Sequence, residues 1–227
     1  MTIIINSRRI LLLLLVGFIQ YTMLFAYTCE IDGIYYNIWS SGDVEVTYGP
    51  AKYTGLVTIP ATITYNDMTF RVNVIGASAF KDCLELTNIT IGDSITKIKD
   101  SAFYGCKSLT SVTIPYSVKE IESNAFYFCE NLIDVTCFSI TPPTLKSYLA
   151  FYPAYYMATL HVPKRSLEAY KATDSFMWNC FIDIVGDAPN NDGNNPIETQ
   201  IDKCDTNGDG EVNIADINTV IDAILSN

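Results

Sequence analysis

The sequence predicts an α/β solenoid, a coil of short stacked repeats, followed by a small appendage of different character. Two observations support this prediction: a segment that repeats itself every 23 residues, and an acid-rich C-terminal stretch that does not share the repeat. The composition suits a chain that buries a core, because 49% of the residues are hydrophobic and 17% are charged. Without an expected export signal, 201 of the 227 residues remain, enough for one elongated domain and the appendage.

Three consecutive segments align without gaps at an offset of 23 residues. They begin at Ile75, Ile98 and Ile121 and read IGASAFKDCLELTNITI, IKDSAFYGCKSLTSVTI and IESNAFYFCENLIDVTC. The matched columns are Ala79, Ala102 and Ala125; Phe80, Phe103 and Phe126; Cys83, Cys106 and Cys129; Leu86, Leu109 and Leu132; Ile89, Val112 and Val135; and, upstream, Val72, Ile95 and Val118. A unit this short cannot bury its apolar face alone, so it must stack on its neighbours, and the period falls within the range of leucine-rich repeats.

Each unit ends in a segment where apolar and polar residues alternate, as they do in a half-buried strand. The alternation predicts a core-facing set of Ile89, Ile91, Val112, Ile114, Val135 and Cys137. The opposite, exposed face is predicted to consist of Asn88, Thr90, Ser111, Thr113, Asp134 and Thr136. We expect this second set to form the ligand-binding face. The A-F-x-x-C segment of each unit is predicted to be a compact turn or a short helix.

The pattern I-x-x-x-A-F-x-x-C-x-x-L-x-x-V-x-I-P resembles the BspA-type leucine-rich repeat of surface proteins from anaerobic bacteria of the mouth and gut. The resemblance covers about residues 30–186 and implies a right-handed coil with a cap at each end. Members of that family are associated with adhesion to host matrix proteins and to other cells. The resemblance therefore implies a protein or glycan ligand on the host or on a neighbouring cell.

The predicted boundaries place an N-terminal cap at 27–71, the repeats at 72–140 and a C-terminal cap at 141–186. Ile59 and Ile91 are 32 residues apart, nine more than the period, and a hairpin turning at Asn66 and Asp67 would absorb the excess. The stretch TLHVPKRSLEAYK from Thr159 resembles the closing unit of the family: a strand, a short helix from Ser166, and Trp178 covering the last coil.

Residues 1–26 have the order of a secretory signal. Arg8 and Arg9 precede an apolar run over 10–19, and Ala26 is a plausible cleavage position. An uncleaved membrane anchor is the alternative, since the apolar stretch is near the lower limit for a span. In either case the protein is expected to be secreted or on the bacterial cell surface, with membrane contact only through this segment.

Several classes of function are unfavourable for this chain. A net charge of −11 disfavours nucleic acid, whose phosphates require clustered positive charge. The sequence lacks the nucleophile-elbow, zinc-protease and phosphate-loop motifs, and the single histidine, His161, lies in an alternating strand of the cap. We therefore expect no enzymatic activity.

The seven cysteines leave two interpretations open. Cys83, Cys106 and Cys129 recur once per unit, so they form either a column of buried free thiols, which we favour, or a disulfide or metal ladder. Cys29, Cys137, Cys180 and Cys204 leave room for a disulfide in an exported chain, but their pairing cannot be read from their spacing.

Most of the acidity lies at the C-terminus. Residues 187–227 contain nine carboxylates and one lysine, a net charge of −8, and within them 187–200 is rich in Asn, Gly and Pro and is predicted to be a linker. The following D-T-N-G-D-G-E-V-N-I-A-D has the oxygen-ligand spacing of a calcium loop. The predicted calcium ligands are Asp205, Asn207, Asp209, Glu211, Asn213 and Asp216. A metal-free turn rich in Asn and Asp is the alternative.

The calcium loop is followed by a segment with helical spacing of apolar residues, up to the C-terminus. A loop with an exit helix and Asp at position twelve resembles a type I dockerin repeat, so residues 201–227 are predicted to be a dockerin-like module. Dockerins carry two such loops and this tail has one. The apolar helix face therefore packs on the solenoid or docks a separate partner.

These observations predict a non-enzymatic secreted or cell-surface recognition protein that binds a protein or glycan and carries a calcium-binding attachment module. The alternative is a scaffold or accessory component of a polysaccharide-degrading assembly, recruited through the dockerin-like tail.

Overall fold

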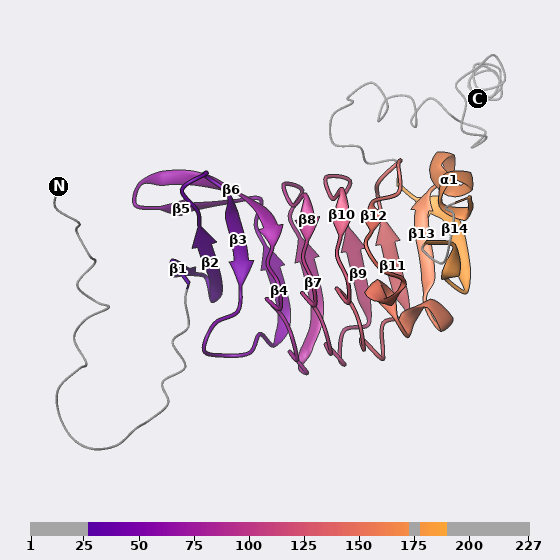
Figure 1. Ribbon diagram of the computed structural model, residues 1–227, viewed down its shortest axis with the longest axis horizontal. Helices are drawn as coiled ribbons and strands as arrows, with labels where there is room; N and C mark the ends of the chain where they lie inside the picture. Colours follow the sequence, from indigo (N-terminus) through magenta and orange to yellow (C-terminus); the bar gives the residue numbers. More distant parts are fainter. Residues whose placement is uncertain (1–26, 173–177, 190–227) are drawn as a thin grey trace, which may run out of the picture.

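The computed structural model describes residues 27–172 and 178–189, which form one elongated coil (Figure 1). The predicted signal at 1–26, the calcium loop and helix at 201–227, and most of the linker at 187–200 lie outside the described residues.

Two rows of parallel strands run along the coil (Figure 1). The front row consists of β4 (Gly55–Ile59), β7 (Leu86–Ile91), β9 (Ser111–Ile114), β11 (Asp134–Cys137), β13 (Thr159–Pro163) and β14 (Asp183–Ala188). The back row consists of β6 (Met68–Ile75), β8 (Lys97–Ile98), β10 (Glu120–Ile121) and β12 (Thr144–Leu145). Each complete repeat therefore contributes one strand to each row, and the core lies between the rows.

The N-terminal part extends the back row. Three further strands, β1 (Cys29–Ile31), β2 (Ile34–Ile38) and β3 (Val44–Thr47), pair in antiparallel order, and β3 joins β6 in parallel. We call the sheet from β1 to β12 the back sheet.

The hairpin predicted at Asn66 and Asp67 is present. The short strand β5 (Thr62–Tyr65) pairs antiparallel with β6, and the two turn residues adopt φ angles of 51° and 61°. Ile59 pairs with Ile91 across β4 and β7, so the nine extra residues leave the register of the front row intact.

The aligned columns form the core, as predicted. All eighteen residues of the six columns are buried, and the rings of Phe80, Phe103 and Phe126 stack 4.9 Å apart. The phenyl column extends beyond the three aligned repeats, because Tyr53 contacts Phe80 and Phe151 stacks on Phe126 at 4.8 Å. This continuous aromatic stack holds successive coils in register.

The repeats contain strands and turns but no helix, which corrects the α/β class predicted for them. The A-F-x-x-C segments are tight turns, and two positions per coil have a positive φ, one directly before each segment and one within it. Those positions are Ser78, Ser101 and Asn124, and Asp82, Gly105 and Phe128. In the described part of the chain the single α-helix is α1 (Leu167–Lys171), which belongs to the closing unit.

The closing unit has the predicted parts. β13 is followed by a 3₁₀ turn, η3 (Lys164–Ser166), and by α1. Trp178 is 1% exposed, donates its indole N–H to the carbonyl of Pro143 at 2.8 Å and lies 5.5 Å from Phe151. The tryptophan therefore covers the end of the aromatic stack.

Candidate ligand-binding face

The front row places the predicted ligand-facing residues on its outer surface. Pairing between β9 and β11 sets Ser111 beside Asp134 and Thr113 beside Thr136, and β7 lies next to β9. The apolar residues between them, including Ile89, Val112 and Val135, are buried as the alternation predicted. The strand pattern is therefore confirmed on both of its faces.

Four of the six predicted residues meet at one hollow. Asn88, Thr90, Ser111 and Thr113 line a depression of about 300 Å³ in the outer face of β7 and β9. Asp134 and Thr136 do not line it and are half-buried on β11. The structure thus concentrates the predicted face on two strands.

Three residues that the strand alternation did not predict complete this hollow: Asp93, Pro115 and Phe138. Pro115 and Phe138 directly follow β9 and β11 in one repeat column, whereas Asp93 is the second residue after β7. The period could have located these positions, but their side chains differ from coil to coil.

The polar groups around the hollow have no hydrogen-bond partner within the described part of the chain. Within 27–172 and 178–189, the side chains of Asn88, Thr90, Ser111 and Thr113 make no hydrogen bond. Hydroxyl and amide groups in such positions can both donate and accept, which suits hydrogen-bonded recognition of a polar ligand.

The outer surface of the back sheet is different, because its charges pair with one another. Lys97 Nζ lies 2.7 Å from Glu120 and 2.5 Å from Glu122, and Lys146 Nζ lies 3.0 Å from Glu120. Its neighbours lower the pKa of Glu120, chiefly through hydrogen bonds from Lys97 and Lys146. This charge ladder links adjacent coils.

His161 lies on β13, as predicted, between two carboxylates. Its Nδ1 is 2.8 Å from Asp187 and its Nε2 is 3.6 Å from Asp134. The two nitrogens are on opposite sides of the ring, so the acids cannot converge with the imidazole on one metal ion. The cluster orients the ring on the sheet and does not pair it with a cysteine, as a Cys-His hydrolase requires.

The cysteine column consists of free thiols. Cys106 and Cys129 each donate their S–H to the carbonyl of the phenylalanine one coil earlier, Phe80 and Phe103, at 3.1 Å. Burial raises the pKa of Cys83 to about 11, and the hydrogen-bonded neighbour Cys129 together with burial raises the pKa of Cys106. Protonated thiols of this kind are poor nucleophiles and poor metal ligands.

The remaining described cysteines, Cys29, Cys137 and Cys180, are also free. Cys204 lies outside the described residues, as do the predicted calcium ligands Asp205, Asn207, Asp209, Glu211, Asn213 and Asp216. In the part of the chain that the structure describes, no three His, Cys, Asp or Glu residues are arranged to hold a metal. The same part contains no helix long and apolar enough to cross a membrane.

The profile of the BspA-type leucine-rich repeat region matches residues 61–180, in six copies. The chain belongs to the BspA-type leucine-rich repeat family. Where the sequence aligned three gap-free repeats, the family profile includes the less regular units at either end, in agreement with the phenyl column that continues through Phe151.

Solved structures of three bacterial proteins are similar to this BspA-type chain. A leucine-rich cell surface protein from Faecalibacterium prausnitzii is 30% identical to this chain, with a TM-score of 0.48. The match covers 62% of this chain and 37% of that protein's chain. A leucine-rich repeat protein from Bacteroides ovatus is 29% identical with a TM-score of 0.49, covering 61% and 36%. One from Bacteroides capillosus is 24% identical with a TM-score of 0.50, covering 60% and 99%.

The chain thus spans little more than a third of the length of the first two of these proteins. The third supports the repeat fold alone. A comparison with curated proteins gives no match.

Proposed function

We propose that this chain is a non-enzymatic, secreted or cell-surface recognition protein that binds a protein or glycan ligand through the outer face of its front row. One observation carries the proposal: Asn88, Thr90, Ser111 and Thr113 line a single hollow with unused hydrogen-bonding groups. The arginines and apolar run of residues 1–26 support export.

A binding array tests this proposal. The full chain is probed against host matrix proteins and glycans, and each saturable interaction is repeated with the double variant Thr90→Val and Thr113→Val. Valine keeps the β-branched shape and removes both hydroxyls, so affinity should fall about tenfold or more, since each hydrogen bond contributes roughly 0.5–1.5 kcal/mol. Thr144→Val, an exposed threonine of the back sheet, is the control. If none of the probes shows saturable binding to the full chain, the recognition function is refuted.

We further propose that residues 201–227 form a calcium-binding attachment module. Support comes from the donor set Asp205, Asn207, Asp209, Glu211, Asn213 and Asp216, which is composed entirely of oxygen ligands, as calcium prefers. Calcium would neutralise part of the local charge and order the loop. Calorimetry should detect calcium uptake by the full chain and its loss in the Asp205→Ala and Asp209→Ala double variant. Equal uptake by both proteins would contradict the loop assignment.

A scaffold role in a polysaccharide-degrading assembly is the second candidate. It is favoured by the dockerin-like spacing of the tail and by the apolar helix face that follows it. In that case, deletion of residues 201–227 should abolish co-purification with the assembly while leaving binding at the front row unchanged. Loss of both properties together would indicate instead that the tail packs on the solenoid.

A further inference from the structure

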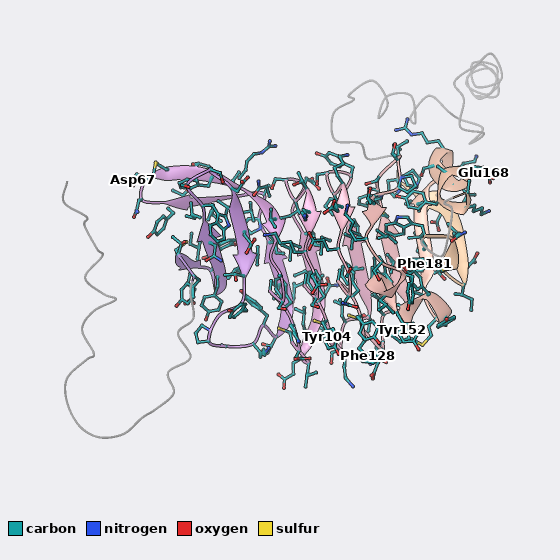
Figure 2. All side chains as sticks on the ribbon, viewed as in Figure 1. Asp67, Tyr104, Phe128, Tyr152, Glu168 and Phe181 are labelled. Atoms are coloured by element: carbon teal, nitrogen blue, oxygen red, sulfur yellow. The ribbon has the colours of Figure 1, made fainter. Side chains whose placement is uncertain are left out.

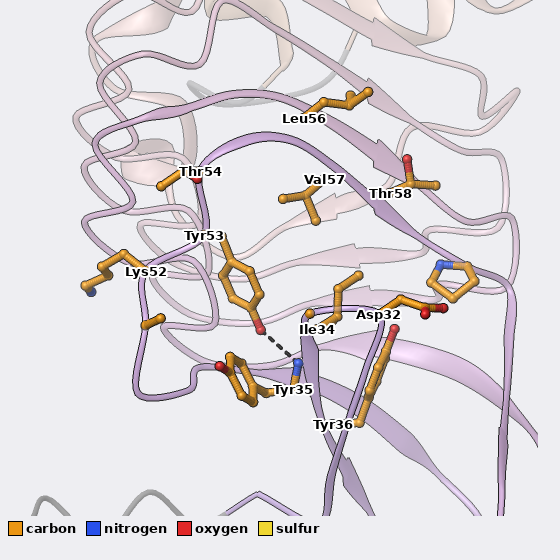
Figure 3. Close-up of a pocket in the computed structure, with 13 residues that line it drawn as sticks. Asp32, Ile34, Tyr35, Tyr36, Lys52, Tyr53, Thr54, Leu56, Val57 and Thr58 are labelled. Carbon is orange, nitrogen blue, oxygen red and sulfur yellow. Dashed lines mark hydrogen bonds between the residues drawn. The ribbon is translucent and has the colours of Figure 1, made fainter.

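The two sheets end at different places at the N-terminal end of the coil. The back sheet continues past β6 into β3, β2 and β1, whereas the front row stops at β4. The step leaves a groove of about 650 Å³ between β4 and the turn that joins β1 to β2 (Figure 3). Its volume lies within the roughly 300–1,000 Å³ of ligand-binding clefts. We call it the N-terminal groove.

The strand β4 forms one wall of this groove and has a free edge. Among the described residues, its backbone pairs with β7 alone, and the Gly55 N–H donates to the Glu85 carbonyl at 2.8 Å on that side. Successive residues of a strand direct their main-chain groups to opposite sides, so Leu56 and Thr58 present theirs to the groove. The Leu56 side chain is 69% exposed. An open strand edge is a template for one more strand.

A buried hydroxyl without a partner lies at the opposite wall. Tyr36 on β2 is 0% exposed, lines the groove, and its hydroxyl has no hydrogen-bond partner in the described structure. By contrast, the Tyr53 hydroxyl in the same groove donates to the Thr47 carbonyl at 2.7 Å and accepts from the Tyr35 N–H at 3.1 Å (Figure 3). A buried donor without a partner is unfavourable, so it favours a ligand that supplies an acceptor.

The environment of Tyr36 keeps this donor available. Burial raises the pKa of Tyr36, and the negative charge of Asp32 adds to the shift, so the hydroxyl retains its proton. Figure 3 shows the hydroxyl end of Tyr36 near Asp32, whose side chain is exposed at the turn between β1 and β2. The other charged lining residue, Lys52, already donates to the Lys81 carbonyl. Lys52 keeps its positive charge in that hydrogen bond, so the groove holds one charge of each sign, and the negative one, Asp32, lies at the turn between β1 and β2.

We propose that the N-terminal groove binds an extended peptide segment of a partner protein, which adds to β4 as one more strand. Main-chain groups of the peptide pair with the free edge at Leu56 and Thr58, and a peptide oxygen accepts a hydrogen bond from Tyr36. A basic side chain of the peptide pairs with Asp32. A glycan lacks the regular alternation of donors and acceptors that a strand edge requires.

Two variants separate binding from folding. Thr58→Pro removes a main-chain donor on the free edge of β4 and leaves the pairing with β7 intact. Proline is tolerated at such edge positions of a strand. Tyr36→Phe removes the unpaired hydroxyl and should leave stability unchanged or slightly higher, since no protein hydrogen bond is lost. Tyr155→Phe is the matched control, because the Tyr155 hydroxyl is also buried and unpartnered but lies at the other end of the coil.

The experiment selects peptides from a phage-displayed random nonapeptide library on the immobilised full chain. Enriched peptides are then titrated by fluorescence polarisation against each variant. We expect enrichment of extended sequences with a basic residue, and affinity reduced about tenfold by Tyr36→Phe and by Thr58→Pro but unchanged by Tyr155→Phe. Asp32→Asn, which preserves the left-handed turn residue type, should remove the preference for the basic residue. Front-row variants should leave peptide binding unchanged.

Two results would overturn the proposal. One is a library without enrichment, or enriched peptides that bind Tyr36→Phe as tightly as the unmodified chain. The other is self-association of the full chain in sedimentation, abolished by Thr58→Pro, with no peptide selected. That second result would assign the edge to another copy of this chain.

Discussion

The phenyl rings of Phe103 and Phe126 lie 4.9 Å apart and within 5° of parallel. This separation nearly equals the distance between neighbouring strands of a sheet, because one coil stacks on the next at strand spacing. The same relationship links Phe80 to Phe103 and Phe126 to Phe151. The aromatic column is therefore the side-chain counterpart of the two backbone ladders, and Phe103 is supported on both sides.

Replacing Phe103 with alanine should lower the free energy of unfolding by about 3–5 kcal/mol, as expected for a fully buried ring whose cavity cannot collapse. Urea unfolding followed by circular dichroism measures the change. Ile133→Ala, at a side chain that is 58% exposed, should shift stability by no more than about 0.5 kcal/mol. Equal effects of the two substitutions would show that the stack does not hold the coils together.

The sequence predicted the repeating core because each column of matched residues occurs in three aligned repeats. Period, alternation and burial agree at Phe80, Phe103 and Phe126, so each repeat confirms the others. The back row was not predicted, since β8, β10 and β12 have two residues each and no alternation can be recognised over that length. The choice between turn and short helix depended on backbone angles, such as the positive φ of Ser101 and Gly105, which composition does not determine.

The candidate site was predicted in part for a similar reason. Alternation identified which residues of β7 and β9 face outward, and four of them line the hollow. It could not show that Asp134 would lie against His161, because these residues are 27 positions apart and do not share the period. The N-terminal groove depends on where the front row ends, a property of topology that no local pattern contains.

The hairpin turn offers a second prediction. Asp67 adopts a φ of 61°, a conformation that glycine adopts without steric cost, and Asn-Gly is the preferred pair for such turns. Asp67→Gly should stabilise the pairing of β5 with β6 by up to about 1 kcal/mol, whereas Asn66→Val should cost about 1–2 kcal/mol. Hydrogen exchange of the β5 amides measures both. Faster exchange in Asp67→Gly would contradict the assigned turn.

The charge ladder of the back sheet predicts a pH dependence. Hydrogen bonds from Lys97 and Lys146 lower the pKa of Glu120 in the folded protein relative to the unfolded chain. The stabilisation is therefore complete above the unfolded value, about pH 4.3, and is lost as the pH falls through the lower folded value. Urea unfolding between pH 7 and pH 3 should show a smaller acid-induced loss of stability in Glu120→Gln than in the unmodified chain. Glu85→Gln, at an exposed glutamate without an ion pair in the described structure, should retain the full loss.

The thiol column predicts a graded reactivity. Cys106 and Cys129 are fully buried and donate hydrogen bonds to main-chain carbonyls, whereas Cys180 is partly exposed. In a Cys204→Ser background, N-ethylmaleimide should modify Cys180 in the native protein, slowly because burial raises its pKa. Cys106 and Cys129 should react only after global unfolding, so their modification across a urea titration should follow the loss of circular dichroism. Peptide mapping by mass spectrometry identifies each site. Two results would contradict this prediction: modification of Cys106 in the native protein as fast as that of Cys180, or a disulfide within the column. Either result would show that the thiols of the column are not buried between the coils.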